Sequence, residues 1–373
     1  MTRSRSRSLN LATTQLLVLH VVEAYGGGVA AVLTDYINAL PEVRHVVLAY
    51  RRPGTQIGGD LEERSELIEM PAGKLNQIRA VRRTVQERRP DVIHAHSSFA
   101  GGYVRAATPR NGARLVYSPH CYSFERADVP APARAGFWCL EAALSFRTDS
   151  VAAVGEWEQL LARRLPRPRD IVIVPHCVQL PALAPNKLNG GPVLTVGRIR
   201  PQKDPEFFAA AARDSRILGS TREWRWVGGG DPALERMLRE SGVTVTGWQP
   251  REAVLRELAS AHAYVHTALW EAGNPIAVLE AAAVGLPVVA RDIPPIRYAG
   301  MERLAATSIE LAQRVLELED EERRHEAVIE ASRFVPPDGV KSQARALRKL
   351  YGIPPVEDSV EPEVRPARFS ASR

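Results

Sequence analysis

Short apolar segments rich in β-branched residues alternate along this chain with segments of helical length. In the first half they predict strands over residues 16–22, 45–49, 92–95, 115–118, 151–154 and 171–174. Helical patterns such as 29–40 and 75–88 separate these strands. Apolar strands that alternate with helices are typical of a parallel sheet covered on both faces. The pattern therefore predicts an α/β fold of the doubly wound kind.

The same alternation starts again after a polar, Pro-rich stretch over residues 175–192, which we interpret as an interdomain connection. The second series predicts strands over residues 193–196, 224–227, 243–246, 263–266 and 287–290. A length of 373 residues also suits two domains. Ligands bind such sheets at the carboxyl ends of the strands, so we expect a binding cleft between the two domains.

Composition excludes several classes of protein. With 45% hydrophobic and 25% charged residues, the chain is typical of a soluble globular protein. No apolar run approaches the roughly 18 residues of a membrane-spanning helix. The first residues are cationic, but the apolar part that follows has only the length of a strand and precedes no cleavage site, so we do not expect export. Three cysteines, Cys121, Cys139 and Cys177, fit a reducing compartment, and we expect a cytoplasmic protein.

The positive charge is unevenly distributed. Residues 1–180 hold 23 Lys and Arg against 17 Asp and Glu, whereas residues 181–373 hold 26 of each. The simpler interpretation is a solvated basic face, and an anionic partner is the alternative. We expect no nucleic-acid partner, because the sequence has no recognisable nucleic-acid motif and no basic and aromatic stacking platform.

Two cations follow the first strand of the second series. Arg198 and Lys203 lie in the loop after residues 193–196, and Asp204 is in position to cap the next helix. Only five of the 49 basic residues are lysines, so a lysine at a strand end is less easily assigned to random surface charge. A guanidinium fork and a compact ammonium together suit a diphosphate, while two solvated loop charges remain the alternative.

The segment from Trp270 to Pro287 is the most informative. A Gly273-Asn274-Pro275 turn follows a strand, and a helix that begins near Pro275 and ends at Gly285 follows the turn. The N-terminus of that helix would direct free N–H groups into the cleft. Glu280 lies in an otherwise apolar part of the helix, where ribose hydroxyls would satisfy its carboxylate. An exposed helical glutamate is the alternative.

Glycine triplets and histidines follow other strands. Gly26–Gly28 and Gly228–Gly230 would let backbone amides approach a ligand, although either triplet could be only a tight turn. His120 comes just after a strand on the first domain's side of the cleft, where it could be structural or functional. His94 and His96 could line the cleft, but the sequence shows no third ligand for a metal.

Six segments are informative as a set. They are VGRIRPQKDPEFF, WVGGGDPALERML and the run from VTVTGWQP to VGLPVVA in the second domain, with GGGVA, RPDVIHAHSS and YSPHCYSF in the first. Over roughly residues 15–350, they resemble family 4 of the retaining glycosyltransferases. The resemblance implies the GT-B fold, in which two Rossmann-like domains face each other across a cleft. It also implies a nucleotide diphosphate sugar as donor substrate, retention of anomeric configuration, and no metal or cofactor.

The resemblance also assigns site residues. His120 and Glu271 would face the transferred sugar as catalytic residues. The donor would contact the following residues: Gly27, Gly28, Arg198, Lys203, Gly229, Trp248, Gly273, Asn274, Pro275, Ile276 and Glu280. One departure concerns the two glutamates, which the family separates by seven residues: 280 − 271 = 9, so eight residues intervene here. Either Asn274 is accommodated as a bulge and Glu271 still reaches the sugar, or Ala272 marks a lost contact.

The resemblance divides the chain by role. We expect an acceptor-side domain over residues 15–180, a nucleotide-sugar-binding domain over 190–335 and a C-terminal helix over 336–351. Residues 352–373 are rich in proline and charge, which predicts a disordered tail.

The expected function is sugar transfer to an acceptor hydroxyl in polysaccharide, glycolipid or glycoconjugate synthesis. A catalytically inactive binding or regulatory protein of the same fold is the alternative, and a sugar-nucleotide epimerase ranks last. The acceptor would be a sugar or a lipid-linked sugar. The segment with Phe137, Trp138, Leu140, Leu144 and Phe146 could lie on the inner face of the membrane, or its aromatic face could pack inside the first domain.

Overall fold

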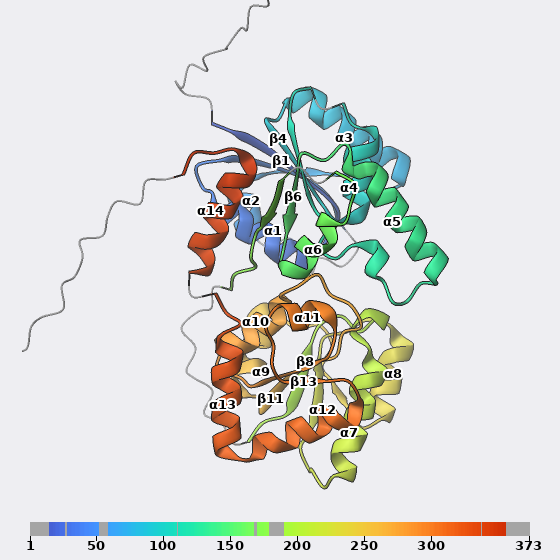
Figure 1. The fold of residues 1–373 in the computed structure, drawn as a ribbon, viewed down its shortest axis with the longest axis vertical. Helices are drawn as coiled ribbons and strands as arrows, with labels where there is room; N and C mark the ends of the chain where they lie inside the picture. Colours follow the sequence, from blue (N-terminus) through green and yellow to red (C-terminus); the bar gives the residue numbers. More distant parts are fainter. Residues whose placement is uncertain are drawn as a thin grey trace, which may run out of the picture.

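The computed structural model describes residues 15–26, 28–51, 59–109, 111–167, 170–178, 190–336 and 338–355. These residues form two α/β units, one above the other in Figure 1, and each unit is built on a parallel sheet. The predicted architecture of two doubly wound sheets is thereby confirmed. Among the described residues, no helix combines the length and apolar character that crossing a membrane requires.

The first sheet has the strand order β3-β2-β1-β4-β5-β6-β7, and all of its strand pairs are parallel. Its strands are β1 (Leu17–Tyr25), β2 (Arg44–Arg51), β3 (Glu66–Glu69), β4 (Val92–His96), β5 (Arg114–Ser118), β6 (Ser150–Ala153) and β7 (Asp170–Ile173). Its helices are α1 (Gly28–Ala39), α2 (Gly59–Arg64), α3 (Lys74–Arg88), α4 (Ser97–Ala107), α5 (Ala131–Ser145) and α6 (Glu156–Arg163), with the short 3₁₀ helix η1 (Ser123–Glu125).

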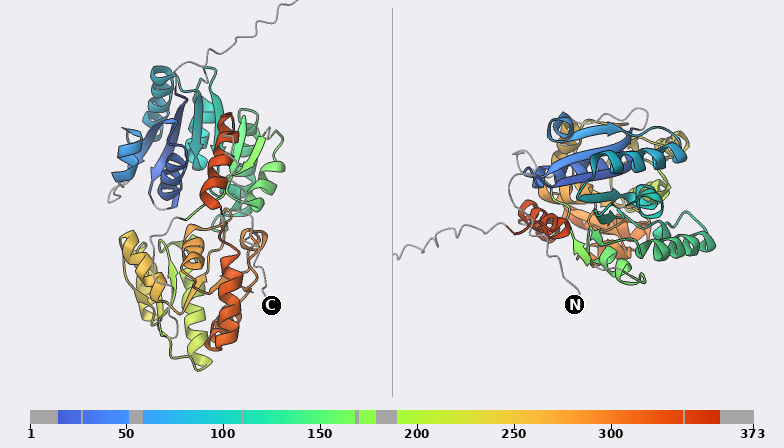
Figure 2. Two further views of the ribbon diagram at one scale, coloured as in Figure 1. Left: turned by 90° about the vertical axis from the view of Figure 1, so that its left-hand side faces the viewer. Right: turned by 90° about the horizontal axis from the view of Figure 1, so that it is seen from above.

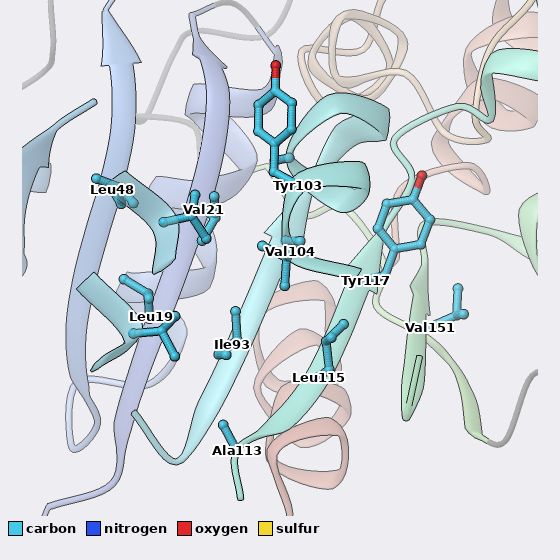
Figure 3. Packing of buried hydrophobic residues seen from close by; sticks show 14 of the residues in the cluster. Leu19, Val21, Leu48, Ile93, Tyr103, Val104, Ala113, Leu115, Tyr117 and Val151 are labelled. Carbon is cyan, nitrogen blue, oxygen red and sulfur yellow. The ribbon is translucent and has the colours of Figure 1, made fainter. Parts of the chain in front are cut away.

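Both faces of this sheet are buried. Leu19 and Val21 of β1 and Ile93 of β4 are fully buried in the same core cluster as Val104 of α4, and Figure 3 shows this packing. Because side chains alternate along a strand, His20 lies on the opposite face, which α1 covers. Removing a buried leucine such as Leu19 from a core of this kind costs about 2–5 kcal/mol.

The second sheet has the order β10-β9-β8-β11-β12-β13 and is also parallel throughout. Its strands are β8 (Val193–Val196), β9 (Trp224–Val227), β10 (Thr244–Val245), β11 (Ala263–His266), β12 (Val288–Arg291) and β13 (Leu304–Ala305). Its α-helices are α7 (Pro205–Ile217), α8 (Pro232–Glu240), α9 (Arg251–Ser260), α10 (Ile276–Ala283), α11 (Pro294–Tyr298), α12 (Ser308–Leu316) and α13 (Glu321–Ser332). Two 3₁₀ helices are η2 (Pro201–Lys203) and η3 (Glu317–Glu319).

The strand order reverses direction beside β1 in the first sheet and beside β8 in the second. At such a switch point the connections leave toward opposite faces, and a crevice opens at the carboxyl ends of the strands. The loops after β8 and β11 meet at this point in the second unit. The fold therefore brings together the segments on which the sequence analysis placed a donor site.

The last helix, α14 (Gly339–Tyr351), returns to the first unit and packs against α1 and β7 (Figure 2). Its last residue, Tyr351, places its hydroxyl 2.8 Å from Nδ1 of His94. Gly352 ends the helix in the left-handed region, and Ile353 packs on the core. The predicted disordered tail therefore begins with residues that cap this helix, and its remainder, 356–373, lies outside the described residues.

Some elements differ from the sequence predictions. Strands β3 and β13 were not predicted, because four and two residues carry too little apolar pattern to stand out. The strand predicted over 243–246 contains only the two residues of β10. Residues 179–189 of the predicted interdomain connection lie outside the described residues.

Helix α5 is attached to the first unit through a buried ion pair. Arg105 of α4 and Glu141 of α5 are both buried, and two guanidinium nitrogens lie 2.8 and 3.1 Å from the two carboxylate oxygens. The hydroxyl of Tyr117 donates to the same carboxylate over 3.0 Å, and its ring lies under the guanidinium. A buried charge is tolerable only with such partners, so this pair fixes the second half of α5.

We predict that Glu141→Gln lowers the free energy of unfolding by about 3–5 kcal/mol, because it leaves the Arg105 cation buried without a counter-charge. Asp128→Asn is the matched control: it removes the carboxylate of the exposed pair with Arg126 and should cost less than about 1 kcal/mol. Urea unfolding of both variants measures the difference. Equal losses would contradict the structural role of the buried pair.

Candidate functional site

The loops that follow β8 and β11 are joined by backbone and side-chain hydrogen bonds. The N–H of Leu269 donates to the carbonyl of Gln202 over 2.9 Å, and the side chain of Gln202 donates to the carbonyl of Trp270 over 3.0 Å. The hydroxyl of Thr267 donates to the carbonyl of Lys203 over 2.6 Å. These bonds hold the loop with the predicted phosphate-binding lysine against the loop with the predicted sugar-binding glutamate.

Lys203 and Glu271 form an ion pair at this junction. Their side chains are only 21% and 13% exposed, so the two charges neutralise each other largely out of water. Burial acts to raise the pKa of Glu271, but the charge and hydrogen bond of Lys203, together with the nearby His266 and Arg200, outweigh burial, so the pKa lies below its usual value. His266 at the end of β11 lies 3.6 Å from the same carboxylate, and burial lowers its pKa to about 3. The site therefore contains a charged pair beside a neutral imidazole.

Asp204 has the capping role that the sequence predicts. It adopts a left-handed conformation with φ of 47°, and its side chain accepts from the N–H of Phe207 in the first turn of α7. The second carboxylate oxygen pairs with Arg291 at the end of β12. The cap therefore fixes the backbone position from which the side chain of the preceding residue, Lys203, extends.

Three predicted donor-site residues lie together after the carboxyl ends of neighbouring strands in the second sheet: Arg198, Gly229 and Trp248. The guanidinium of Arg198 lies over the ring of Trp248, 5.8 Å from its centre. A Cβ built on Gly229 would lie 3.2 Å from that ring and 3.2 Å from a carboxylate oxygen of Glu235, so the absence of a side chain lets both groups pack against the backbone. The indole is 65% exposed. The arrangement offers an aromatic face and a cation beside a backbone without a side chain.

The turn before α10 lies at the contact between the two units. A Cβ built on Gly273 would lie 3.3 Å from Cγ2 of Val154 in the first unit. The Nδ1 of His176 lies 2.8 Å from the carbonyl oxygen of Asn274. Helix α10 itself begins at Ile276, after Pro275, and its first N–H groups have no partner within the helix. This N-terminus therefore faces the boundary between the units.

Glu280 is buried in α10, as its apolar neighbours indicate, but the structure provides a partner that the sequence analysis did not find. Arg251 at the start of α9 lies 3.0 Å from its carboxylate. Burial raises the pKa of Glu280 and the charge of Arg251 opposes this. Asp35 of α1 lies close enough for both charges to act on it, and burial raises the pKa of Asp35 to about 6. Ligand hydroxyls are therefore not needed to satisfy Glu280, although they could still bind it.

His120 follows β5 in a strained turn. Both His120 and Cys121 have positive φ angles, 49° and 83°, which residues with side chains rarely adopt. Glu158 of α6 holds this turn: its carboxylate oxygens accept from the N–H of Cys121 and the N–H of Val154, each over 2.9 Å. Glu158 is fully buried, and burial raises its pKa to about 7. The strained turn is therefore stabilised by Glu158, which lies 38 positions after His120 in the chain.

This turn faces the second unit. Burial raises the pKa of the Cys121 thiol, and the charges of Glu271 and Arg200 also act on that thiol. A Cβ on Gly155, which precedes α6, would lie 3.6 Å from the backbone of Gly273. The predicted catalytic residues His120 and Glu271 thus approach the same boundary from opposite units.

The structure gathers most predicted donor-site residues after the carboxyl ends of strands in the second sheet, in two groups. Lys203, Glu271 and the turn before α10 form one group, and Arg198, Gly229 and Trp248 form the other. Gly28 begins α1, and a Cβ built on it would meet no atom within 4 Å, whereas Gly27 lies outside the described residues.

Sequence reasoning missed several residues of the site: Asp35, Glu158, His176, Arg251 and His266. Glu158 gave one local signal, because an acidic residue in the first turn of a helix just after a strand can accept from free backbone N–H groups. The others are brought to the site only by tertiary contacts.

A group of histidines corrects one sequence-based conclusion about metals. Nitrogens of His20, His94 and His96 lie within 4.8 Å of one another, so His20 supplies the third position that the sequence did not show. These rings already hydrogen-bond to one another or to neighbours such as Ser118 and Tyr351. We therefore assign them to a hydrogen-bonded network rather than to a metal centre.

Comparison with known proteins identifies two matching families. Residues 191–321 match the family described as glycosyl transferases group 1, and residues 27–177 match the glycosyl transferase 4-like domain. The two matches together cover every strand of the two sheets except β1.

Two protein sequences and one solved structure are informative relatives. A UDP-Gal:α-D-GlcNAc-diphosphoundecaprenol α-1,3-galactosyltransferase of Escherichia coli is 27% identical over 227 residues, which span 54% of this chain and 58% of that protein. A protein from the cps region of Klebsiella pneumoniae is 23% identical over 83% of this chain and 90% of its own length. The structure of Anabaena HepE in complex with UDP-glucose superposes with a TM-score of 0.72 at 16% identity, covering 91% of this chain and 100% of that one.

We predict that Glu158→Ala lowers the free energy of unfolding by about 2–4 kcal/mol, because two buried N–H groups lose their acceptor. The loss should depend on pH. The folded pKa of about 7 lies above the unfolded value of 4.5, so the contribution of this group is greatest below pH 4.5 and is lost as pH rises through 7.

Glu156→Ala is the matched control, since Glu156 is exposed in the same helical turn. Chemical unfolding at pH 4.5 and pH 8 measures both variants. An unchanged stability of Glu158→Ala at both pH values would show that the turn does not need this carboxylate.

Proposed function

We propose that this chain, which belongs to the glycosyltransferases with a GT-B fold, transfers a sugar from a nucleoside diphosphate sugar to an acceptor hydroxyl with retention of anomeric configuration. The observation that carries the proposal is the junction of the β8 and β11 loops. Lys203 there lies at the carboxyl edge of the second sheet, where doubly wound folds bind nucleotides. Retention is what the resemblance to family 4 implies.

In this proposal the diphosphate is held by Lys203, Arg198 and the N-terminus of α10. The Glu271 carboxylate neutralises Lys203 before the donor binds. A diphosphate brings two further negative charges, and one ion pair at about 4 Å near a protein surface is worth about 4 kcal/mol. The same groups would stabilise the charge that develops on the diphosphate as the sugar leaves, which is how such sites lower an activation barrier.

We further propose uridine as the base. The Escherichia coli relative is named as a transferase of UDP-galactose, and the Anabaena protein is described with UDP-glucose. The exposed indole of Trp248 beside Gly229 offers a flat apolar face for a base, and Arg198 lies over the same ring. Glu280 would bind the ribose hydroxyls, and the charge of Arg251 opposes the rise that burial causes in the pKa of Glu280.

The transferred sugar would lie between Glu271 and His120. Eight residues separate Glu271 from Glu280, yet the Glu271 carboxylate reaches Lys203 at the centre of the site. We therefore favour the interpretation in which Asn274 is accommodated in the turn and Glu271 binds a sugar hydroxyl. In the front-face transfer that the family suggests, the departing phosphate oxygen takes the proton of the acceptor hydroxyl. His120 would orient the sugar from the first unit.

We predict that Lys203→Ala lowers the rate of transfer, and of slow donor hydrolysis, by about 100-fold or more, because a cation on the leaving diphosphate is lost. Lys341→Ala is the matched control, since Lys341 is exposed on α14, and it should leave both rates unchanged. The assay incubates the protein with UDP-, GDP- and ADP-sugars and measures released nucleotide.

Faster hydrolysis of UDP-sugars than of the other donors is the expected result. Equal rates for Lys203→Ala and the wild type would contradict the diphosphate site. Binding of UDP without hydrolysis or transfer of any donor would favour the alternative, an inactive nucleotide-sugar-binding protein.

We also propose that the acceptor is lipid-linked and is taken from the inner face of the membrane. The name of the Escherichia coli relative specifies an acceptor on diphosphoundecaprenol. The alternative, in which the aromatic face of the segment from Phe137 to Phe146 packs inside the first unit, does not hold for three of its apolar side chains. Trp138, Leu140 and Phe146 are 41%, 54% and 58% exposed, whereas Leu144 is buried.

The exposed apolar side chains have basic neighbours. Arg134 is exposed in the first turn of α5, and Lys74 lies 5.2 Å from the ring centre of Phe99, which is itself about half exposed. Apolar side chains interleaved with cations suit the interface of an anionic bilayer. The charge surplus of the first 180 residues, 23 cations against 17 anions, has the same sign.

We predict that the protein sediments with phosphatidylglycerol-containing vesicles at low ionic strength and is released by salt. Changing both Trp138 and Leu140 to serine should reduce the bound fraction several-fold, since each side chain loses its apolar contact. Ile217→Ser is the control, because Ile217 is 80% exposed on the second unit. Absence of wild-type binding at low salt would exclude the membrane contact and leave a soluble acceptor.

A further inference from the structure

Four histidines form a continuous line across the first sheet. The line joins His45 on β2, His20 on β1, His96 on β4 and His120 after β5, and these strands are neighbours in the order β2-β1-β4-β5. Consecutive rings are 3.1 Å apart, nitrogen to nitrogen, at all three steps.

The strand register produces this line. His45 pairs with Val18, two residues before His20. The register then pairs His20 with His94, two residues before His96. In the same way His96 pairs with Ser118, two residues before His120. Each step therefore crosses one strand and advances two residues, which keeps every side chain on one face and moves toward the carboxyl edge.

The far end of the line is fixed by a backbone carbonyl. The Nε2 of His45 lies 3.1 Å from the carbonyl oxygen of Leu40. A carbonyl only accepts, so this nitrogen must carry the proton. A neutral imidazole has one donor and one acceptor nitrogen, and the Nδ1 of His45 is therefore the acceptor.

The same rule assigns the protonated nitrogen of each further ring in the line. The Nδ1 of His45 accepts from Nε2–H of His20, the Nδ1 of His20 accepts from Nε2–H of His96, and the Nδ1 of His96 accepts from Nε2–H of His120. Burial lowers the pKa of His20 and His96 well below the usual value and that of His120 to about 3, so the rings are neutral at neutral pH. The opposite set of tautomers would place two lone pairs against each other at Leu40.

We propose that His96, His20 and His45 are positioning residues that hold His120 in its Nε2–H tautomer and leave Nδ1 as a hydrogen-bond acceptor for a hydroxyl of the transferred sugar. This inference rests on the proposed function for the identity of the ligand. The tautomer itself follows from the hydrogen bonds alone. A fixed acceptor orients the sugar without reorganisation when the donor binds.

The test reads the tautomer directly in the ligand-free protein. Nitrogen-15-labelled histidine side chains give distinct NMR shifts for the two neutral tautomers, and the His120 signals are assigned by their loss in His120→Asn. We expect the Nε2–H form of His120 in the wild type. The Nδ1–H form would overturn the proposal, and this measurement needs no variant of His45, His20 or His96 to fold.

A second experiment distinguishes a positioning role of these histidines from a role in packing alone. His45→Phe removes the anchor two rings away from His120, so we expect a mixture of His120 tautomers. Because the proposed donor contacts lie mostly on the second unit, both tautomers should bind the donor. The value of kcat should then fall in proportion to the Nε2–H fraction, with KM for the donor changed less than kcat.

His94→Phe is the matched control. His94 is equally buried on the same face but hydrogen-bonds to Ser118 and Tyr351, outside the line, so both tautomer and kcat should stay within about twofold of the wild type. Unchanged His120 tautomers in His45→Phe, or equal kcat losses in the two variants, would overturn the proposal. If the tautomer is as expected but no donor is hydrolysed or transferred, the proposed function fails and the tautomer assignment stands.

Discussion

The ion pair between Lys203 and Glu271 is the interaction on which the arrangement of the site depends. It joins the loops that follow β8 and β11, and it lies largely out of water. A buried cation without a partner would be costly, and so would a buried carboxylate. The charge of Lys203 therefore favours the ionised form of Glu271 in the absence of a ligand, and a bound diphosphate would give Lys203 a second anionic partner.

The first unit contributes neutral groups to the same boundary. Burial keeps His120 uncharged, and Glu158 holds its turn in a conformation that the backbone alone disfavours. The second unit supplies the charges and the first supplies a fixed orientation. This division fits a reaction in which negative charge develops on the diphosphate while the sugar must be held in place.

Much of the fold could be predicted because apolar strands and helical segments repeat clearly, and strands β8, β9 and β11 have the predicted bounds. Less of the site could be predicted from the sequence. Lys203 and Asp204 could be placed from their position after a strand, but the pairing of Glu280 with Arg251 depends on how α9 packs against α10, which no local pattern encodes. The exposure of the aromatic side chains of α5 likewise depends on which half of that helix packs against the rest of the first unit.

The central claim is that a nucleoside diphosphate binds at the junction of the β8 and β11 loops. A crystal structure of the protein with UDP tests it most directly. The proposed function predicts diphosphate oxygens within hydrogen-bond distance of Lys203 Nζ and of the first N–H groups of α10, with the ribose hydroxyls at Glu280. A diphosphate bound away from Lys203, or UDP bound only to the first unit, would contradict it.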